Sequence, residues 1–197
     1  MKQSANKRKI IVITDGDQSA QKVVEKAAAE IGGRAISLSG GNPTGVSGPA
    51  IAAAIKKAPY DPVLVMVDDC GAQNQGKGEQ ILAYLAQEPG LEILGVIAVA
   101  SNTAGVDGVP VTASVTSDGL VINEPVDKHG RPTPSGGRRI TGDTVDVLNR
   151  LQIPIIIGVG DLGKMEDGGE LSNGARIATI AVNEILKRSG YQKRLEG

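Results

Sequence analysis

Short apolar runs alternate with amphipathic stretches along most of the chain. Five runs have the length and the β-branched character of strands: residues 9–14, 34–38, 62–67, 92–100 and 153–159. The third and fourth runs are apolar without alternation, which is typical of strands covered on both faces of a parallel sheet. Helical spacing of apolar residues, or capping residues at the start, predicts helices at 18–31, 47–57, 78–87, 141–150 and 175–187.

This alternation predicts an α/β fold, because each connection between parallel strands needs a crossover of helix length. We expect a three-layer, mostly parallel, Rossmann-like sheet in a single domain over residues 1–197. The alternation breaks after residue 105. Residues 109–116 and 120–123 flank Ser117-Asp118-Gly119 as the arms of a β-hairpin would, and a loop rich in proline and glycine follows. Residues 109–140 are therefore the predicted insertion.

Composition narrows the classes of function. Phe and Trp are absent and Tyr occurs three times, so Ile, Val, Leu and Ala must fill the core. A formal charge of -1 and the lack of aromatic stacking platforms disfavour a nucleic-acid partner. The lone Cys70 forms no internal disulfide and suits a reducing compartment. Neither a signal peptide nor a transmembrane segment is visible, so we expect a protein that is not secreted.

Polar side chains gather where the predicted strands end. In an open parallel sheet these loops meet at one edge, where ligands bind. The expected residues of this crevice come from the loops after each strand: Asp15, Asp17, Asn42, Asp68, Asp69, Ser101, Asn102, Asp161 and Lys164. No residue among them is identified as catalytic.

Two interpretations of the aspartates stay open. Carboxylates are hard oxygen ligands, so Asp15, Asp68 and Asp69 would hold Mg²⁺ if they converge. Asp is also a common helix-capping residue at the start of a helix, and Asp17 stands where an N-cap belongs. Carboxylates that converge would favour a charge-coupled site, whereas aspartates that each cap a helix would favour a structural role.

Other signals are weaker. Residues 158–163 match G-x-G-x-x-G, but after the last strand rather than the first. Cys70 follows two aspartates, which raise a thiol pKa, so we expect a small packing residue. His129 has no nucleophile motif around it. Cations collect at the edge opposite the crevice, where helices end: Lys7, Arg8, Lys9, Lys56, Lys57, Lys187, Arg188, Lys193 and Arg194. Such an edge suits an anionic membrane surface or merely the helix dipoles.

Several segments resemble the family of proteins called stage V sporulation protein AE. They are residues 13–17, 31–34, 39–43, 59–63, 94–102 and 158–165, and their order and spacing match over nearly the whole chain. The resemblance implies a spore-forming bacterium and a protein encoded with the stage V sporulation A membrane proteins. That group is linked to dipicolinic acid movement and to spore germination. The resemblance transfers no catalytic residue.

Three functions follow as hypotheses. The first is a non-enzymatic accessory protein, cytoplasmic or in the forespore, peripheral to the spore inner membrane, with the group's membrane proteins, an anionic membrane or a second copy as partners. The second is a metal-dependent phosphoesterase or phosphoryl-transfer enzyme that resembles Toprim domains. This chain lacks their glutamate after the first strand and has Asp68-Asp69 rather than Asp-x-Asp after the third. The third is a small-anion binder in the same crevice.

Overall fold

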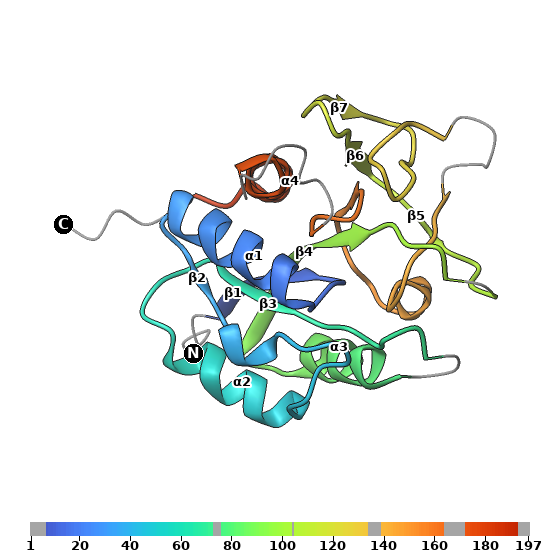
Figure 1. The fold of residues 1–197 in the computed structure, drawn as a ribbon. Coiled ribbons are helices and arrows are strands. Elements are labelled where there is room, and N and C mark those ends of the chain that lie inside the picture. Colours follow the sequence, from blue (N-terminus) through green and yellow to red (C-terminus); the bar gives the residue numbers. More distant parts are fainter. Residues whose placement is uncertain (1–6, 73–75, 104, 134–138, 164–171, 193–197) are drawn as a thin grey trace.

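A seven-stranded sheet forms the centre of the protein (Figure 1). The computed structural model describes residues 7–72, 76–103, 105–133, 139–163 and 172–192. Across the sheet the strands are β2 (Arg34–Ala35), β3 (Val63–Met66), β1 (Arg8–Ile13), β4 (Leu91–Val99), β9 (Ile156–Val159), β6 (Ala113–Val115) and β7 (Val121–Ile122). Only the β6–β7 pair in this sheet is antiparallel. The predicted mostly parallel sheet is confirmed.

Helices cover both faces of the sheet, as predicted for a three-layer fold. Helices α1 (Gln18–Glu30) and α4 (Ser172–Ser189) lie together on one face, and α2 (Gly48–Lys57) and α3 (Lys77–Gln87) lie on the other (Figure 1). The strand order is not that of the dinucleotide-binding fold, because β3 lies between β1 and β2. The chain passes from β1 to the edge strand β2, returns to place β3 between β2 and β1, and then adds β4 on the other side of β1. Loops that follow β1, β3, β4 and β9 therefore meet at one edge.

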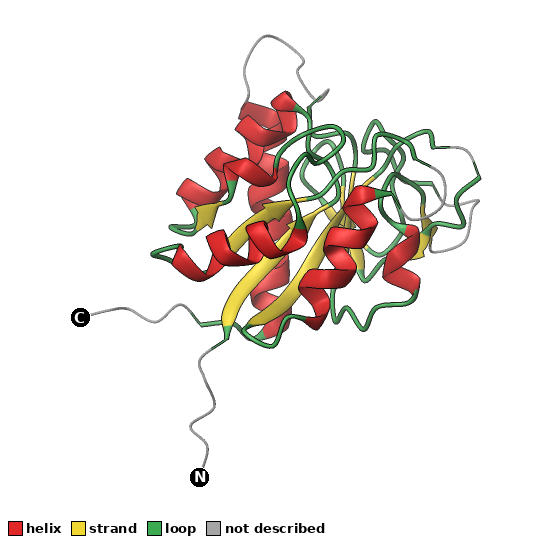
Figure 2. Cartoon of the chain, turned by 90° about the horizontal axis from the view of Figure 1, so that it is seen from below, coloured by secondary structure: helices red, strands yellow, loops and turns green. Residues whose placement is uncertain are grey.

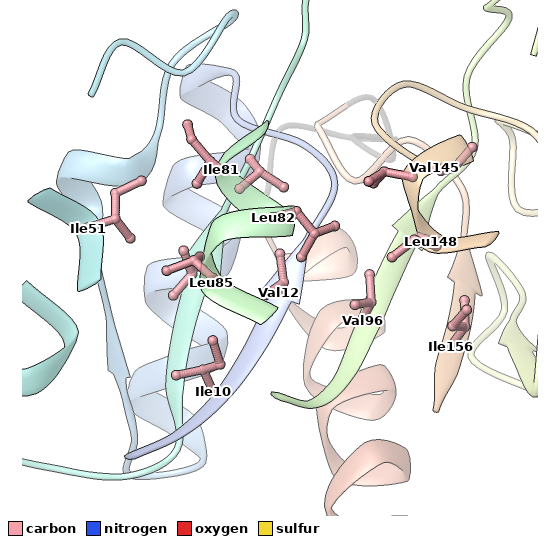
Figure 3. Packing of buried hydrophobic residues seen from close by; sticks show 14 of the residues in the cluster. Ile10, Val12, Ile51, Ile81, Leu82, Leu85, Val96, Val145, Leu148 and Ile156 are labelled. Atoms are coloured by element: carbon pink, nitrogen blue, oxygen red, sulfur yellow. The ribbon is translucent and has the colours of Figure 1, made fainter. Parts of the chain in front are cut away.

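Aliphatic side chains fill both layers of the core. On the α2–α3 face, Ile10 and Val12 of β1 and Val96 of β4 are buried under helix residues such as Ile51 and Leu82 (Figure 3). The alternate residues of the same strands, Ile11, Ile13 and Ile97, pack beneath α1 and α4. This strict alternation follows from the period of two in a strand. The expected core without Phe or Trp is confirmed.

The predicted hairpin is present and extends the main sheet. Strands β6 and β7 pair with Val115 opposite Val121, and the Thr116 N–H donates to the Leu120 carbonyl across the turn. Strand β6 also pairs in parallel with β9, so the hairpin is the edge of the sheet rather than a separate lobe. A second pair, β5 (Val109–Pro110) and β8 (Arg139–Ile140), brackets the long loop.

Two elements differ from their prediction. The predicted helix at 141–150 is wrong, because only a 3-10 turn, η2 (Asp146–Asn149), forms there. Thr144 has a φ of 59°, outside the helical region, and Asp146 accepts backbone N–H groups from Asp107 and Gly108 instead of capping a helix. The predicted strand at 34–38 stops at Ala35 and continues as the 3-10 turn η1 (Ser37–Ser39).

Gly95 offers a test of this packing. A Cβ there would lie 2.9 Å from the backbone oxygen of Ile155 and 2.9 Å from Cγ2 of Ile185. We expect Gly95→Ala to lower the free energy of unfolding by roughly 1–3 kcal/mol, because the carbonyl cannot move without disturbing β9. Urea denaturation measures the change. Gly45→Ala is the matched control, since a Cβ there meets nothing within 4 Å; equal losses in both variants would contradict this account.

Candidate functional site

The turn after β1 holds the centre of the crevice. The Asp17 carboxylate caps α1 by accepting the Ala20 N–H at 2.8 Å, and the Asp15 carboxylate accepts the Asp17 N–H at 3.3 Å. Between them, a Cβ on Gly16 would lie 2.4 Å from the Gly41 oxygen and 3.1 Å from Cβ of Asp68. The loops after β1, β2 and β3 therefore touch at Gly16, where a side chain has no room.

Four of the predicted carboxylates converge on this turn. The pKa of Asp15 rises from 3.8 to about 7, first because the carboxyl is buried and then because Asp17, Asp68 and Asp161 carry like charges nearby. The loop after β9 is close as well, because a Cβ on Gly163 would lie 3.4 Å from an Asp17 carboxylate oxygen. Aspartates that follow β1, β3 and β9 thus influence one another electrostatically.

The two aspartates after β3 have different partners. Asp68 is buried, and its carboxylate accepts the Cys70 N–H at 2.7 Å. Burial raises the pKa of Asp68, the Cys70 bond opposes this, and the charges of Asp143 and Asp69 add to the rise. Asp69 instead caps α3: its Oδ1 accepts the N–H groups of Gly78 at 2.5 Å and Glu79 at 3.2 Å. It does what the N-cap residue of α3, a glycine, cannot do.

Of the other residues predicted for the crevice, Ser101 is hydrogen-bonded within it and two asparagines are exposed. The Ser101 hydroxyl lies 2.6 Å from that of Thr103 and accepts the Asp143 N–H at 3.1 Å. Asn42 and Asn102 are exposed, and Lys164 lies outside the described residues. Among the residues that the structure describes, no three carboxylate, His or Cys side chains are grouped as metal ligands. The proposed Mg²⁺ ligands Asp15, Asp68 and Asp69 stay a prediction. The Asp69 carboxylate is directed toward the N-terminus of α3.

A second acidic group beside the crevice was missed by sequence reasoning. Asp143 accepts the Gly71 N–H at 3.0 Å and the Thr103 hydroxyl, and Glu79 accepts the Val147 N–H at 3.2 Å. Asp143, Thr103 and Glu79 line a cleft of about 670 Å³ together with Asp69, Asp107, Thr144, Asp146, Asn149 and Arg150. The prediction of a helix at 141–150 hid this group, although the density of acidic and Thr residues from 141 to 146 was a usable signal.

Cys70 and His129, the weaker candidates, are both exposed. Cys70 is exposed with a φ of 54°, so the expectation of a packing residue is wrong. The tight turn after β3, held by Asp68, turns Cys70 outward. His129 is exposed. Its backbone N–H donates to the Asp127 carboxylate, and this bond closes a local turn. The same loop reaches the crevice, because the Asp161 N–H donates to the Lys128 carbonyl at 2.8 Å.

Cations at the opposite edge are extensively paired. The strands of the parallel sheet begin at this edge (Figure 2). Arg8 pairs with Asp61 at 3.0 Å, Lys56 with Glu88 at 2.8 Å and Arg188 with Glu184 at 2.7 Å, and Lys9 pairs with Glu92. Lys7, Lys57 and Lys187 are exposed there, while Lys193 and Arg194 lie outside the described residues. Much of the basic charge predicted for this edge is therefore balanced locally.

Comparison with known proteins identifies the family. The model of the SpoVAE family, described as stage V sporulation protein AE1, matches residues 9–189. The chain belongs to this family. The match runs from β1 to the end of α4 and so includes every strand-end loop of the crevice. Searches of curated proteins and of solved structures found no match. Within the described part of this SpoVAE chain, none of the helices is long and apolar enough to cross a bilayer.

The raised pKa of Asp15 predicts how stability depends on pH. Between about pH 4 and 7 the folded protein keeps a proton that the unfolded chain has released, so the free energy of unfolding falls as pH rises through this window. We expect Asp15→Asn to make this slope shallower, since the raised pKa values of Asp68 and Glu79 keep part of it, and to stabilise the protein above pH 7 by roughly 1–3 kcal/mol. Urea denaturation from pH 4 to 8 measures it. Glu124→Gln, at an exposed carboxylate, is the control and leaves the slope unchanged; an unchanged slope in Asp15→Asn would contradict the prediction.

Proposed function

We propose that this SpoVAE protein is a non-enzymatic accessory protein of the stage V sporulation A membrane proteins. Membership of the family, over residues 9–189, carries the proposal and makes the protein sporulation-related. The proposal adds a place at the periphery of the spore inner membrane and a role in dipicolinic acid movement during germination. Its task there is to bind membrane partners through its surface.

The roles of the crevice aspartates support a binding rather than a catalytic function. Asp17 and Asp69 cap α1 and α3, and Asp68 accepts the Cys70 N–H of its own turn. Each carboxylate therefore has a structural task that accounts for its presence without any reaction. What remains is a charged edge built on rigid strand ends, which is a surface suited to recognition.

A deletion strain tests the proposal. We expect spores without this gene to release dipicolinic acid more slowly after a germinant is added, and the wild-type gene to restore the rate. Terbium fluorescence measures the release. Normal release kinetics and a normal dipicolinic acid content in the deletion strain would count against the proposal. Sedimentation with anionic vesicles at low salt separates contact with lipid from contact with membrane proteins, since retention in the supernatant excludes the lipid.

A metal-dependent phosphoesterase is the second candidate, and one observation favours it. A carboxyl with a pKa of about 7, as at Asp15, suits general acid–base chemistry at neutral pH. Calorimetric titration with Mg²⁺ and Mn²⁺ decides between the candidates. For an accessory protein we expect no saturable heat. Saturable heat in the wild type that is lost in Asp15→Ala would favour the enzyme.

A further inference from the structure

Thr144 has a backbone conformation that its residue type disfavours. Its φ of 59° lies in the left-handed region, and among the described residues other than glycine only Cys70 also has a positive φ. A β-branched residue is an outlier there, because its branched side chain crowds the backbone. Cys70 is exposed, whereas Thr144 is 4% exposed. The backbone of Thr144 is therefore strained, and such strain persists only where the surroundings hold it.

The side chain of Thr144 does not offset this strain. A left-handed Asn or Asp residue can do so, because its short polar side chain forms local hydrogen bonds. The Thr144 hydroxyl is buried and has no hydrogen-bond partner within the described part of the chain. The neighbouring residues must therefore keep Thr144 in its conformation.

Asp143 fixes the chain on the N-terminal side of Thr144. Its backbone N–H donates to the Ser101 hydroxyl at 3.1 Å. Its carboxylate accepts the Gly71 N–H at 3.0 Å and the Thr103 hydroxyl. Asp143 is thus bound to the loop after β3 and to the start of the loop after β4.

Asp146 fixes the chain on the C-terminal side of Thr144. Its carboxylate accepts the Gly108 N–H at 2.8 Å and the Asp107 N–H at 3.1 Å. These partners lie where the chain enters β5, further along than the partners of Asp143. Thr144 therefore joins two short segments that are anchored to different places.

The two anchors belong to one cleft. Asp143 and Asp146 both line the cleft of about 670 Å³, and so do their hydrogen-bond partners Thr103 and Asp107. Because Thr144 lies between the two anchors, a backbone rotation at this residue changes the shape of the cleft. Hinges in proteins are single residues or short segments that absorb such a rotation.

The sequence indicates what the second conformation is. Residues 141–150 have a helical pattern, yet they form only the turn η2. Val145 already has helical angles, with φ of -93° and ψ of -28°. Val145 and Leu148 are buried on the α2–α3 face, three residues apart, as one side of a helix requires (Figure 3). A negative φ at Thr144 would extend η2 toward Asp143, which is a preferred N-cap residue type.

We propose that Thr144 is a strained hinge: Asp143 holds it in the left-handed conformation, and release of Asp143 converts residues 144–149 into a helical turn that reshapes the cleft. The inference does not depend on the proposed function. Strain at one residue costs roughly 5- to 150-fold in an equilibrium constant. Hydrogen bonds to a carboxylate stabilise by a similar amount. The two conformations are therefore close in free energy, which is the condition for a switch.

Replacement of Thr144 by Gly and by Ala tests the strain. Both changes remove the unpartnered hydroxyl, so the two variants differ in backbone preference alone. Gly is favoured over Ala at a positive φ, whereas Ala is favoured over Gly in a helix. We expect urea denaturation of the full chain to give an unfolding equilibrium constant at least about fivefold smaller for Thr144→Gly than for Thr144→Ala. The opposite order would overturn the proposal.

The same pair of variants in an Asp143→Ala background tests the hinge. Without the Asp143 carboxylate, the backbone at residue 144 relaxes to a helical φ. We expect the advantage of Thr144→Gly over Thr144→Ala to vanish or to reverse. Asp127→Ala is the matched control, because it removes a carboxylate that accepts two backbone N–H groups in another loop and leaves the advantage intact. An advantage that persists in the Asp143→Ala background would overturn the proposal.

A second variant and a second measurement keep the proposal falsifiable if Asp143→Ala does not fold. Asp143→Asn removes the charge and one of the two acceptor oxygens. We expect the NMR chemical shift of the Thr144 Cα to move toward its helical value in Asp143→Asn and to stay unchanged in Asp127→Asn. An unchanged shift in Asp143→Asn would show that Asp143 does not hold the hinge, and would overturn the proposal.

Discussion

The parallel sheet imposes one constraint on which the rest of the structure depends: it brings the loops after β1, β3, β4 and β9 to the same edge. All four of these loops carry aspartates, so folding concentrates like charges. The fold tolerates this because backbone N–H groups point at the carboxylates. Asp17 and Asp69 accept them from the first turns of α1 and α3, and Asp68 accepts one from Cys70. Helix ends and tight turns thus stabilise the acidic edge that the strand directions create.

Close backbone contacts make this arrangement rigid. Gly16 touches the loops after β2 and β3, and its oxygen accepts the Gly41 N–H at 2.6 Å. Asp143 joins the loop after β3 to the segment before η2 through Gly71. The strand-end edge is therefore held together by segments that are far apart in the chain and contact one another.

The two edges of the sheet differ in their charged residues. At the edge where the strands begin, Arg8, Lys56 and Arg188 are paired with acids, while Lys7, Lys57 and Lys187 are exposed. At the strand-end edge, Arg150 lies 3.7 Å from the Glu79 carboxylate.

Hydrophobic periodicity by itself determined the layers, the parallel strands and the hairpin, because buried positions repeat with periods of 2.0 and 3.6 wherever packing is regular. The same pattern led to the prediction that Asp15, Asp17, Asp68 and Asp161 lie at one edge of the sheet, since strand direction dictates where strands end. Tertiary structure alone decided the strand order, the capping of α3 by the distant Asp69, and the fold of residues 141–150. Those outcomes depend on contacts between segments far apart in the chain, as where Glu79 and Gly71 bind Val147 and Asp143, and no local pattern encodes such contacts.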